Sequence, residues 1–448
     1  MKRRSFIKKA GLAAAGVVAA PYILPSGRLF AATGSQLAEH VVFVLFAGGV
    51  RQQESVLQRY LDDSQGVPIQ GNIMSNMLDG ALPTQKVVFG TSGVLDGDTP
   101  IPRILNQTMQ RQGTLFREVN CRRVGHYQGL NALVTGQYAA TQGLKQKPLF
   151  PTIFEYVRRH LGVAASKTWF VGNGIGNSVP LLNHSLHPDY GSAYGGNFIA
   201  PRIAFELDKL GQKHMKNAKV YHPEEELDPI YEMKFFLDQA AMVEEGRDLP
   251  GIKNTPEEKE LLREFFRLMF NKTDSGTIAH PPVRDNNDMK TIGYACEVMK
   301  FFKPTLTVIN LNSVDGCHSN FTGYLKSLHR ADHGVAHIWD YIQTQIPEMA
   351  GNTAMVIIPE HGRNLVPNPI QDINDFFAYD HSDANSRRVF SMMLGPGIPQ
   401  NMQVGSEANP RGEATDGIVT VADILGIKNE VLNAGYVYAG SQSYLDQI

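Results

Sequence analysis

Two kinds of hydrophobic pattern alternate along the chain. Short apolar runs rich in β-branched residues are typical of buried parallel strands, and they occupy residues 40–46, 169–172, 305–311, 354–358 and 389–394. Helical periodicity predicts helices at residues 150–161, 257–270, 288–302 and 322–346. Strands that alternate with helices predict an α/β fold, here a three-layer αβα sandwich with a mainly parallel sheet.

One stretch interrupts this alternation. Residues 200–290 are dense in Lys and Glu and keep a helical period, which predicts a helical insertion or cap rather than a second core. Residues 173–200, rich in Gly, Asn and Ser, predict a long ordered loop near the functional site. We interpret residues 33–448 as a single domain that carries this insertion.

The N-terminal residues 1–32 follow another pattern. Arg3 and Arg4 precede a short apolar run, residues 10–20, which is followed by prolines. This is typical of the twin-arginine export signal, which bacteria use for proteins that fold before they leave the cytoplasm. The alternatives are a basic amphipathic N-terminus or a membrane anchor, but the run is shorter than the roughly 20 residues that span a bilayer. Cleavage at Ala31-Ala32 and retention of the signal both stay open.

An export signal predicts where the protein works and what it meets. We expect the twin-arginine translocase as a partner during export, the periplasm or cell envelope as the destination, and no transmembrane segment in the mature chain. Proteins of the cell envelope are further possible partners. Export in the folded state suits a protein that acquires a metal, cofactor or partner first.

Charge and cysteine content narrow the class of protein. The formal net charge of the 448 residues is −2, but the segment 1–32 holds six basic residues and no acidic one. Without that segment 36 basic and 44 acidic residues remain, a formal charge near −8, so no basic stripe suggests a nucleic-acid partner. The three cysteines, Cys121, Cys296 and Cys317, are too few for a disulfide-built scaffold.

Imidazole and carboxylate side chains recur where the predicted strands 305–311 and 354–358 end and where 389–394 begins. They are Asp315, His318, Glu360, His361 and His381. Ligands of α/β sheets lie at the carboxyl ends of the strands, and these side chains supply nitrogen and oxygen ligands for a divalent metal such as zinc, manganese or calcium. Each pair alone also fits a turn with a capped histidine, whereas their repetition at several strand ends favours a metal site.

Two further features are weaker candidates. His329, His333 and His337 share one side of the helix 322–346, a spacing that fits either a metal site or, beside the apolar stripe of that helix, packing; we favour packing. Cys317 is a possible zinc ligand, but a single loop thiol is more typical of a small buried residue.

These clusters resemble the alkaline phosphatase and sulfatase superfamily, and most closely its twin-arginine-exported, sulfatase-like branch of unknown function. The matching motifs are Gly48-Gly49 after the first strand, His126 ten residues ahead of Gly136, Glu360 with Gly362, Arg363 and Asn368, Asp380-His381, and the ending 415–427. The resemblance covers about residues 38–430. It implies a metal site built from the five residues at the strand ends.

The chain departs from the superfamily at positions that matter for chemistry. Gly48 and Gly49 stand where its phosphatases place a metal-binding Asp, and His126 stands where they place the attacking Ser, Thr or modified Cys. Histidine cannot become formylglycine, which excludes the ordinary sulfatase mechanism. Asp315 and His318 are three residues apart where four are common, so a two-metal site of the phosphatase kind would lack a ligand.

The resemblance implies metal-assisted hydrolysis of phosphate or sulfate esters, with a metal that lowers the pKa of a water molecule or polarises the ester. His126 would be a further ligand or the acid–base group, and Asp380 would orient a ligand histidine. Arg363 would hold a phosphate or sulfate oxygen, or else form a structural ion pair with Asp372 or Asp375. The alternative is a non-catalytic binding or structural component of a cell-envelope assembly.

Overall fold

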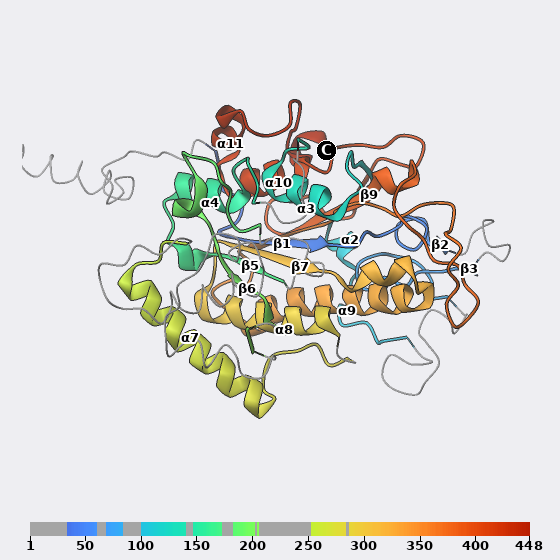
Figure 1. Cartoon of the computed structure of the whole chain (residues 1–448), viewed down its shortest axis with the longest axis horizontal. Coiled ribbons are helices and arrows are strands. Elements are labelled where there is room, and N and C mark those ends of the chain that lie inside the picture. The colour runs from blue at the N-terminus through green and yellow to red at the C-terminus, as the bar shows by residue number, and fades with distance from the viewer. Residues whose placement is uncertain are drawn as a thin grey trace, which may run out of the picture.

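The computed structural model describes residues 34–60, 69–83, 100–139, 147–172, 182–201, 204–205, 252–283 and 286–448. The predicted signal segment and residues 206–251 of the predicted insertion lie outside these ranges. An eight-stranded sheet forms the centre of the molecule, in the order β10-β4-β9-β8-β1-β7-β5-β6 (Figure 1). Its strands are β1 His40–Phe46, β4 Gly113–Asn120, β5 Thr168–Val171, β6 Asn197–Ile199, β7 Leu306–Leu311, β8 Thr353–Pro359, β9 Arg388–Leu394 and β10 Met402–Val404.

Helices cover both faces of this sheet, so the fold is the predicted three-layer α/β sandwich. In Figure 1, α7, α8 and α9 lie below the sheet, and α3, α4, α10 and α11 lie above it. The helices are α2 Met109–Gln112, α3 His126–Thr135, α4 Ile153–Leu161, α7 Pro256–Ser275, α8 Asn287–Phe302, α9 Phe321–Gln345, α10 Asp416–Ile424 and α11 Lys428–Ala434. A separate pair of short strands, β2 Arg59–Tyr60 and β3 Ile69–Gln70, lies beside the main sheet.

The five strands expected from apolar runs are all present, but one of them has the opposite direction. β1 pairs in parallel with β7 and β8, whereas β9 runs antiparallel to both of its neighbours, β8 and β4. The prediction that residues 389–394 form a parallel strand is therefore wrong. A parallel strand needs a crossover, usually a helix, and between β8 and β9 the chain forms loops and one short 3₁₀ turn, Asn385–Arg387.

Burial explains why the apolar runs identified the central strands and missed β4. Every residue of β1, β7 and β8 is buried, because helices cover both faces. β4 contains Arg117 and Glu118, which break its apolar run, and it lies nearer the edge of the sheet. A search for continuous apolar runs does not detect a strand that polar residues interrupt in this way.

The described part of the predicted insertion packs against the sheet domain. α7 begins with a capping box between Thr255 and Glu258, which satisfies the first free N–H groups of the helix. Its Phe265 ring lies 6.0 Å from the ring of Trp169 in β5 and 5.0 Å from that of Phe302 in α8. This part of residues 200–290 thus shares the main hydrophobic core.

The histidine row on α9 serves packing, as favoured from the sequence. His329 is buried and uses both ring nitrogens in hydrogen bonds, with the carbonyl of Ile73 at 2.8 Å and the N–H of Ile101 at 2.9 Å. His337 Nε2 lies 3.2 Å from the carbonyl oxygen of Ala279. Among the described residues, no helix is both long enough and apolar enough to cross a membrane.

Candidate metal centre

A glycine turn after β1 makes room for the site. Gly48 and Gly49 have φ angles of 102° and 79°, a backbone conformation that residues other than glycine rarely adopt. A Cβ atom on Gly48 would lie 2.5 Å from the Cβ of Asp315, and one on Gly49 would lie 2.6 Å from Nδ1 of His361. Both distances are far below van der Waals contact, so these positions require glycine for Asp315 and His361 to approach the end of β1.

Strand direction then gathers the candidate side chains at one edge of the sheet. Asp315 and His318 lie in the 3₁₀ turn Ser313–His318 that follows β7, and Glu360 follows β8 directly. Because β9 is antiparallel, the loop that carries His381 before it stays at the edge where β8 ends. The five residues predicted as metal ligands thus belong to loops at the same edge.

His126 joins them from the helix layer. It is the first residue of α3. Gly129 lies where a Cβ atom would approach the carbonyl oxygen of Glu360 to 2.9 Å, which lets α3 pack closely against the end of β8. The ring centroids of His126 and His381 are 4.6 Å apart.

One group of side chains, the Glu360 group, consists of Glu360, His361 and His126. His126 Nδ1 lies 2.7 Å from Glu360 Oε1 and 3.2 Å from His361 Nε2, and His361 Nε2 lies 3.2 Å from Glu360 Oε1. Glu360 is fully buried; the N–H of Gly48 donates to Oε1 at 2.5 Å, but Oε2 has no hydrogen-bond partner among the described residues. A buried carboxylate oxygen without a partner is costly, and a cation beside it would remove that cost.

A second group, the Asp315 group, consists of Asp315, His318 and His381 and also meets His126. Asp315 Oδ1 lies 3.2 Å from His126 Nε2 and 3.4 Å from His318 Nε2. His318 Nε2 in turn lies 3.2 Å from His381 Nε2. These side chains are partly exposed, so this group faces the solvent while the Glu360 group lies beneath it.

Hydrogen bonds on the far side of the rings leave the Nε2 atoms available as ligands. His318 Nδ1 donates to Asp380 Oδ1 at 2.7 Å, and His361 Nδ1 donates to the carbonyl oxygen of Gly362 at 2.7 Å. Since a carboxylate and a carbonyl only accept, each ring carries its proton on Nδ1 and a lone pair on Nε2. Metal-binding histidines have this arrangement.

Electrostatics favour the ionised carboxylates. Burial by itself would raise the pKa of Glu360, but the neighbouring His361 and the hydrogen bond from His126 lower it to about 2. Burial would also raise the pKa of Asp315, and contacts with His318, His126 and Arg363 lower it below its ordinary value. The pKa of His381 falls to about 3 because of burial and of nearby positive groups. Anionic carboxylates and neutral imidazoles are the forms that bind metals.

Arg363 lies beneath the site and does not reach the solvent. The fully buried side chain donates from Nη2 to Asp315 Oδ1 at 2.8 Å and to the carbonyl oxygen of Gly48, and from Nη1 to the carbonyl oxygen of Tyr379 at 3.2 Å. The ion pair expected with Asp372 or Asp375 is therefore wrong, because Asp315 is the acidic partner. Arg363 holds Asp315 in place.

A buried ionic cluster that the sequence did not reveal supports this floor. Arg51 and Glu54 form a fully buried ion pair, and the guanidinium lies 3.7 Å from the centre of the Tyr379 ring. Burial would lower the pKa of Arg51, but Glu54 and Tyr379 raise it above its ordinary value. Glu54, the nearest acid after Gly48-Gly49, is thus engaged with Arg51. The sequence signal for this cluster was a pair of opposite charges, three residues apart and shortly after the buried strand β1.

Donor chemistry and spacing fit a divalent ion. Four ligands about 2.0–2.1 Å from a tetrahedral ion lie roughly 3.3 Å from one another, and most of the printed donor pairs in both groups are 3.2–3.4 Å apart. The donors are mostly imidazole nitrogens, which suit zinc, whereas manganese prefers oxygen ligands and calcium takes six to eight of them. Among the described residues, the clusters with metal-ligand spacing both contain His126.

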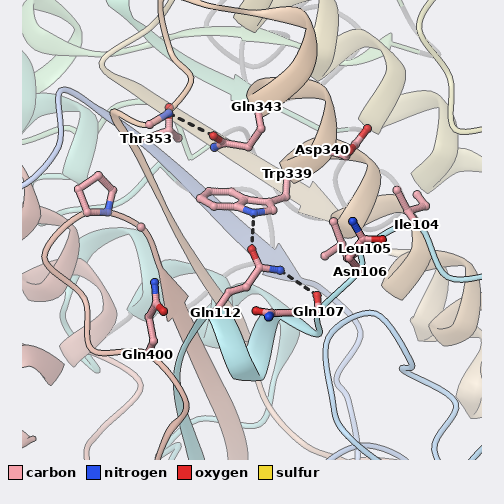
Figure 2. Close-up of a pocket in the computed structure, with 13 residues that line it drawn as sticks. Ile104, Leu105, Asn106, Gln107, Gln112, Trp339, Asp340, Gln343, Thr353 and Gln400 are labelled. Carbon is pink, nitrogen blue, oxygen red and sulfur yellow. Dashed lines mark hydrogen bonds between the residues drawn. The ribbon is translucent and has the colours of Figure 1, made fainter.

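A large cavity lies at the other edge of the sheet and is separate from this centre. Its volume is about 670 Å³, and Trp339, Gln112 and Gln343 are among its lining residues (Figure 2). Trp339 Nε1 donates to Gln112 Oε1 at 3.1 Å. Thr353, which also lines it, begins β8, so the cavity faces the amino ends of the parallel strands. No candidate metal ligand lines it.

Comparison with known proteins finds solved structures that are similar to this chain. No protein-family model matches the chain, and no curated protein matches it. A protein in the alkaline phosphatase superfamily from Vibrio parahaemolyticus is similar, with a TM-score of 0.39, 11% identity, and coverage of 89% of this chain and 68% of that one. A TAB5 alkaline phosphatase mutant with Mg bound has a TM-score of 0.40, 11% identity, and coverage of 87% and 98%. BT1596, a 2-O GAG sulfatase, has a TM-score of 0.42, 12% identity, and coverage of 92% and 74%.

Proposed function

We propose that this chain is an exported, metal-dependent hydrolase-like protein for phosphate or sulfate esters. In this proposal it is a member of the alkaline phosphatase and sulfatase superfamily, in its twin-arginine-exported branch. The observation that carries the proposal is the convergence of His361 and His126 on Oε1 of Glu360, while Oε2 of the same carboxylate has no partner among the described residues. A fixed group of this kind at the carboxyl edge of an α/β sheet is typical of a metal-dependent site.

The ligands of the proposed site are Asp315, His318, Glu360, His361, His381 and His126. A divalent ion held there would lower the pKa of water and polarise an ester oxygen. Asp380 orients His318 through its hydrogen bond with Nδ1. Arg363 positions Asp315 from below, and its burial makes this role a better fit than direct contact with the ester. Zinc is the proposed ion because imidazoles dominate the ligand set.

The site offers no activated hydroxyl or thiol for a covalent mechanism at the start of α3. His126 stands there, engaged with Glu360 and Asp315. The two nearby thiols are buried: burial raises the pKa of Cys121 and of Cys317 to about 12, so neither is a thiolate at neutral pH. Water is therefore the proposed nucleophile, which predicts slow turnover of esters.

Export is part of the proposal and rests on residues 1–32 of the sequence. Arg3 and Arg4 before the short apolar run support passage through the twin-arginine translocase to the periplasm or cell envelope. The metal would be loaded in the cytoplasm, because folding and ligand convergence precede this route. Replacing both arginines with lysine should retain the protein in the cytoplasm, and export of that variant at the normal rate would contradict the proposal.

A second candidate is a non-catalytic component of a cell-envelope assembly. The observation that favours it is the substitution at the two positions from which the related phosphatases act, Gly48 and His126. Such a protein would keep the fold and the metal, and would use them to hold a binding surface rather than to hydrolyse an ester.

The two candidates differ in one assay. The purified chain should hydrolyse aryl phosphate or aryl sulfate esters when zinc or manganese is added, and the activity should disappear in His361→Ala. His187→Ala, which changes a histidine packed against Tyr436 outside the site, is the matched control and should retain full activity. A metal-loaded protein without turnover on either ester would reject the hydrolase and favour the envelope component.

A further inference from the structure

The two nitrogens of His126 face different groups of donors. Nδ1 lies 2.7 Å from Glu360 Oε1 and 3.2 Å from His361 Nε2. Nε2, on the other side of the ring, lies 3.2 Å from Asp315 Oδ1. The ring of His126 thus lies between Glu360 and Asp315, while the two groups also meet where the rings of His361 and His381 stack with centroids 4.3 Å apart.

The two sides of the ring differ in how the described residues satisfy their polar atoms: one side leaves a carboxylate oxygen without a partner, and the other brings two imidazole nitrogens together. On the Nδ1 side this atom is Glu360 Oε2. On the Nε2 side, His318 carries its proton on Nδ1, so its Nε2 lone pair faces His381 Nε2 at 3.2 Å. The other nitrogen of that ring, His381 Nδ1, is buried and has no hydrogen-bond partner among the described residues. One cation beside Nδ1 would satisfy the first side and leave the second side unchanged.

The donors on both sides have the spacing of ligands around an ion. His361 Nε2 is 3.2 Å from each of its two neighbours in the Glu360 group. In the Asp315 group, the steps from His126 through Asp315 and His318 to His381 measure 3.2, 3.4 and 3.2 Å. Ligands of one tetrahedral ion lie roughly 3.3 Å apart. His126, Glu360 and His361 offer three ligand atoms within 4.8 Å of one another, and so do His126, His318 and His381, with Asp315 beside His126 and His318.

We propose that His126 bridges two divalent ions as an imidazolate, with Nδ1 in the Glu360 group and Nε2 in the Asp315 group. This inference rests on the proposed metal-dependent function and specifies how its ions are held. The neutral ring gives up its single N–H proton to the solvent, and each of its two nitrogens then has a lone pair for one ion, since metal ligands bind in deprotonated form. A ring that bridges is held from both sides, which explains why a histidine at the first turn of α3 serves both groups.

Metal content of the full chain tests the bridge. Zinc-loaded wild-type protein should hold about two ions per chain, and His361→Ala and His381→Ala should each hold about one, because each removes a ligand from one side only. His126→Asn keeps an oxygen near the Nδ1 position and has no atom at Nε2, so it should keep the ion of the Glu360 group alone. His126→Ala should weaken binding on both sides at least tenfold. His187→Ala, outside the site, should bind as the wild type does.

Copper provides a readout that is independent of activity. Two copper(II) ions on one imidazolate couple their spins, so the electron paramagnetic resonance signal of the copper-loaded wild type should be largely lost. In His126→Asn the signal of an isolated copper(II) ion should return. Circular dichroism of each variant checks the fold, and if His126→Ala does not fold, the Asn variant decides.

Three results would overturn the bridge. These are one ion per chain in the wild type, two ions with an undiminished resonance signal, and a folded His126→Ala that retains one ion at wild-type affinity. One ion together with metal-dependent ester turnover rejects the bridge and keeps the proposed function. No bound ion in the wild type rejects both.

Discussion

Two regions of this molecule are rich in histidine, and they behave differently. At the carboxyl edge of the sheet, imidazoles face carboxylates and one another at 2.7–3.4 Å. On α9, His329 and His337 instead bond to backbone groups, and the neighbouring acid, Asp332, accepts from the N–H groups of Asn76 and Met77. The difference is that the imidazoles at the sheet edge share a pocket with carboxylates, as the proposed metal site requires, whereas His329 and His337 are bonded to backbone groups.

The largest expected effect separates these regions directly. His361→Ala should lower the zinc affinity of the Glu360 group at least 100-fold, because it removes a fully buried side chain that is proposed as a ligand. Zinc at about 100 times its dissociation constant should stabilise the wild type by about 2.7 kcal/mol per bound ion, and the variant should lose the part of this gain that the Glu360 group contributes. Thermal unfolding with and without zinc measures it. An equal zinc-induced shift in both proteins would remove His361 from the site.

The second prediction concerns stability at acidic pH through the α9 row. Burial, and then the nearby His337 and His329, lower the pKa of His333 from 6.5 to about 4. The unfolded chain binds the proton more tightly, so the contribution of neutral His333 is complete above pH 6.5 and is lost as the pH falls toward 4. The difference between the pKa of His333 in the unfolded and in the folded chain corresponds to roughly 3 kcal/mol of unfolding free energy at most.

His333→Gln tests this dependence because glutamine stays neutral over the whole range. Unfolding free energies measured by denaturant at pH 7 and pH 4.5 should fall less for the variant than for the wild type. If the two proteins lose the same stability between these values, His333 does not carry the effect.

A smaller effect is expected from the residue that orients a ligand. Asp380→Asn should weaken metal binding by about 10- to 100-fold, the usual range for a group that holds a metal-binding histidine. The reason is the 2.7 Å hydrogen bond between its carboxylate and His318 Nδ1. Isothermal titration with zinc measures the affinity. Unchanged affinity would mean that His318 is held without Asp380 or is not a ligand.

The smallest effect should come from the α9 row itself. His337→Ala removes a hydrogen bond to the carbonyl oxygen of Ala279, and should cost about 1 kcal/mol of stability. Metal content and affinity should remain those of the wild type. A loss of bound metal in this variant would mean that the α9 row takes part in metal binding, which contradicts the comparison between the two regions.

Much of the architecture was predictable from local pattern. The central strands β1, β7 and β8 are buried on both faces, so each reads as an apolar run whatever its neighbours are. The direction of β9 was not predictable in this way, because a buried strand has the same composition in either direction. β4 was missed because Arg117 and Glu118 interrupt its apolar residues.

The sequence by itself determined which residue types stand at the strand ends, and therefore that Asp315, His318, Glu360 and His361 belong to one edge of the sheet. Only the tertiary structure decided what each side chain meets. Arg363 pairs with Asp315 rather than with an acid nearer in sequence. His126 contacts Asp315 and Glu360, and each of them is almost 200 residues or more from His126 along the chain. Contacts over such separations depend on how layers pack, and spacing along the chain carries no measure of that distance.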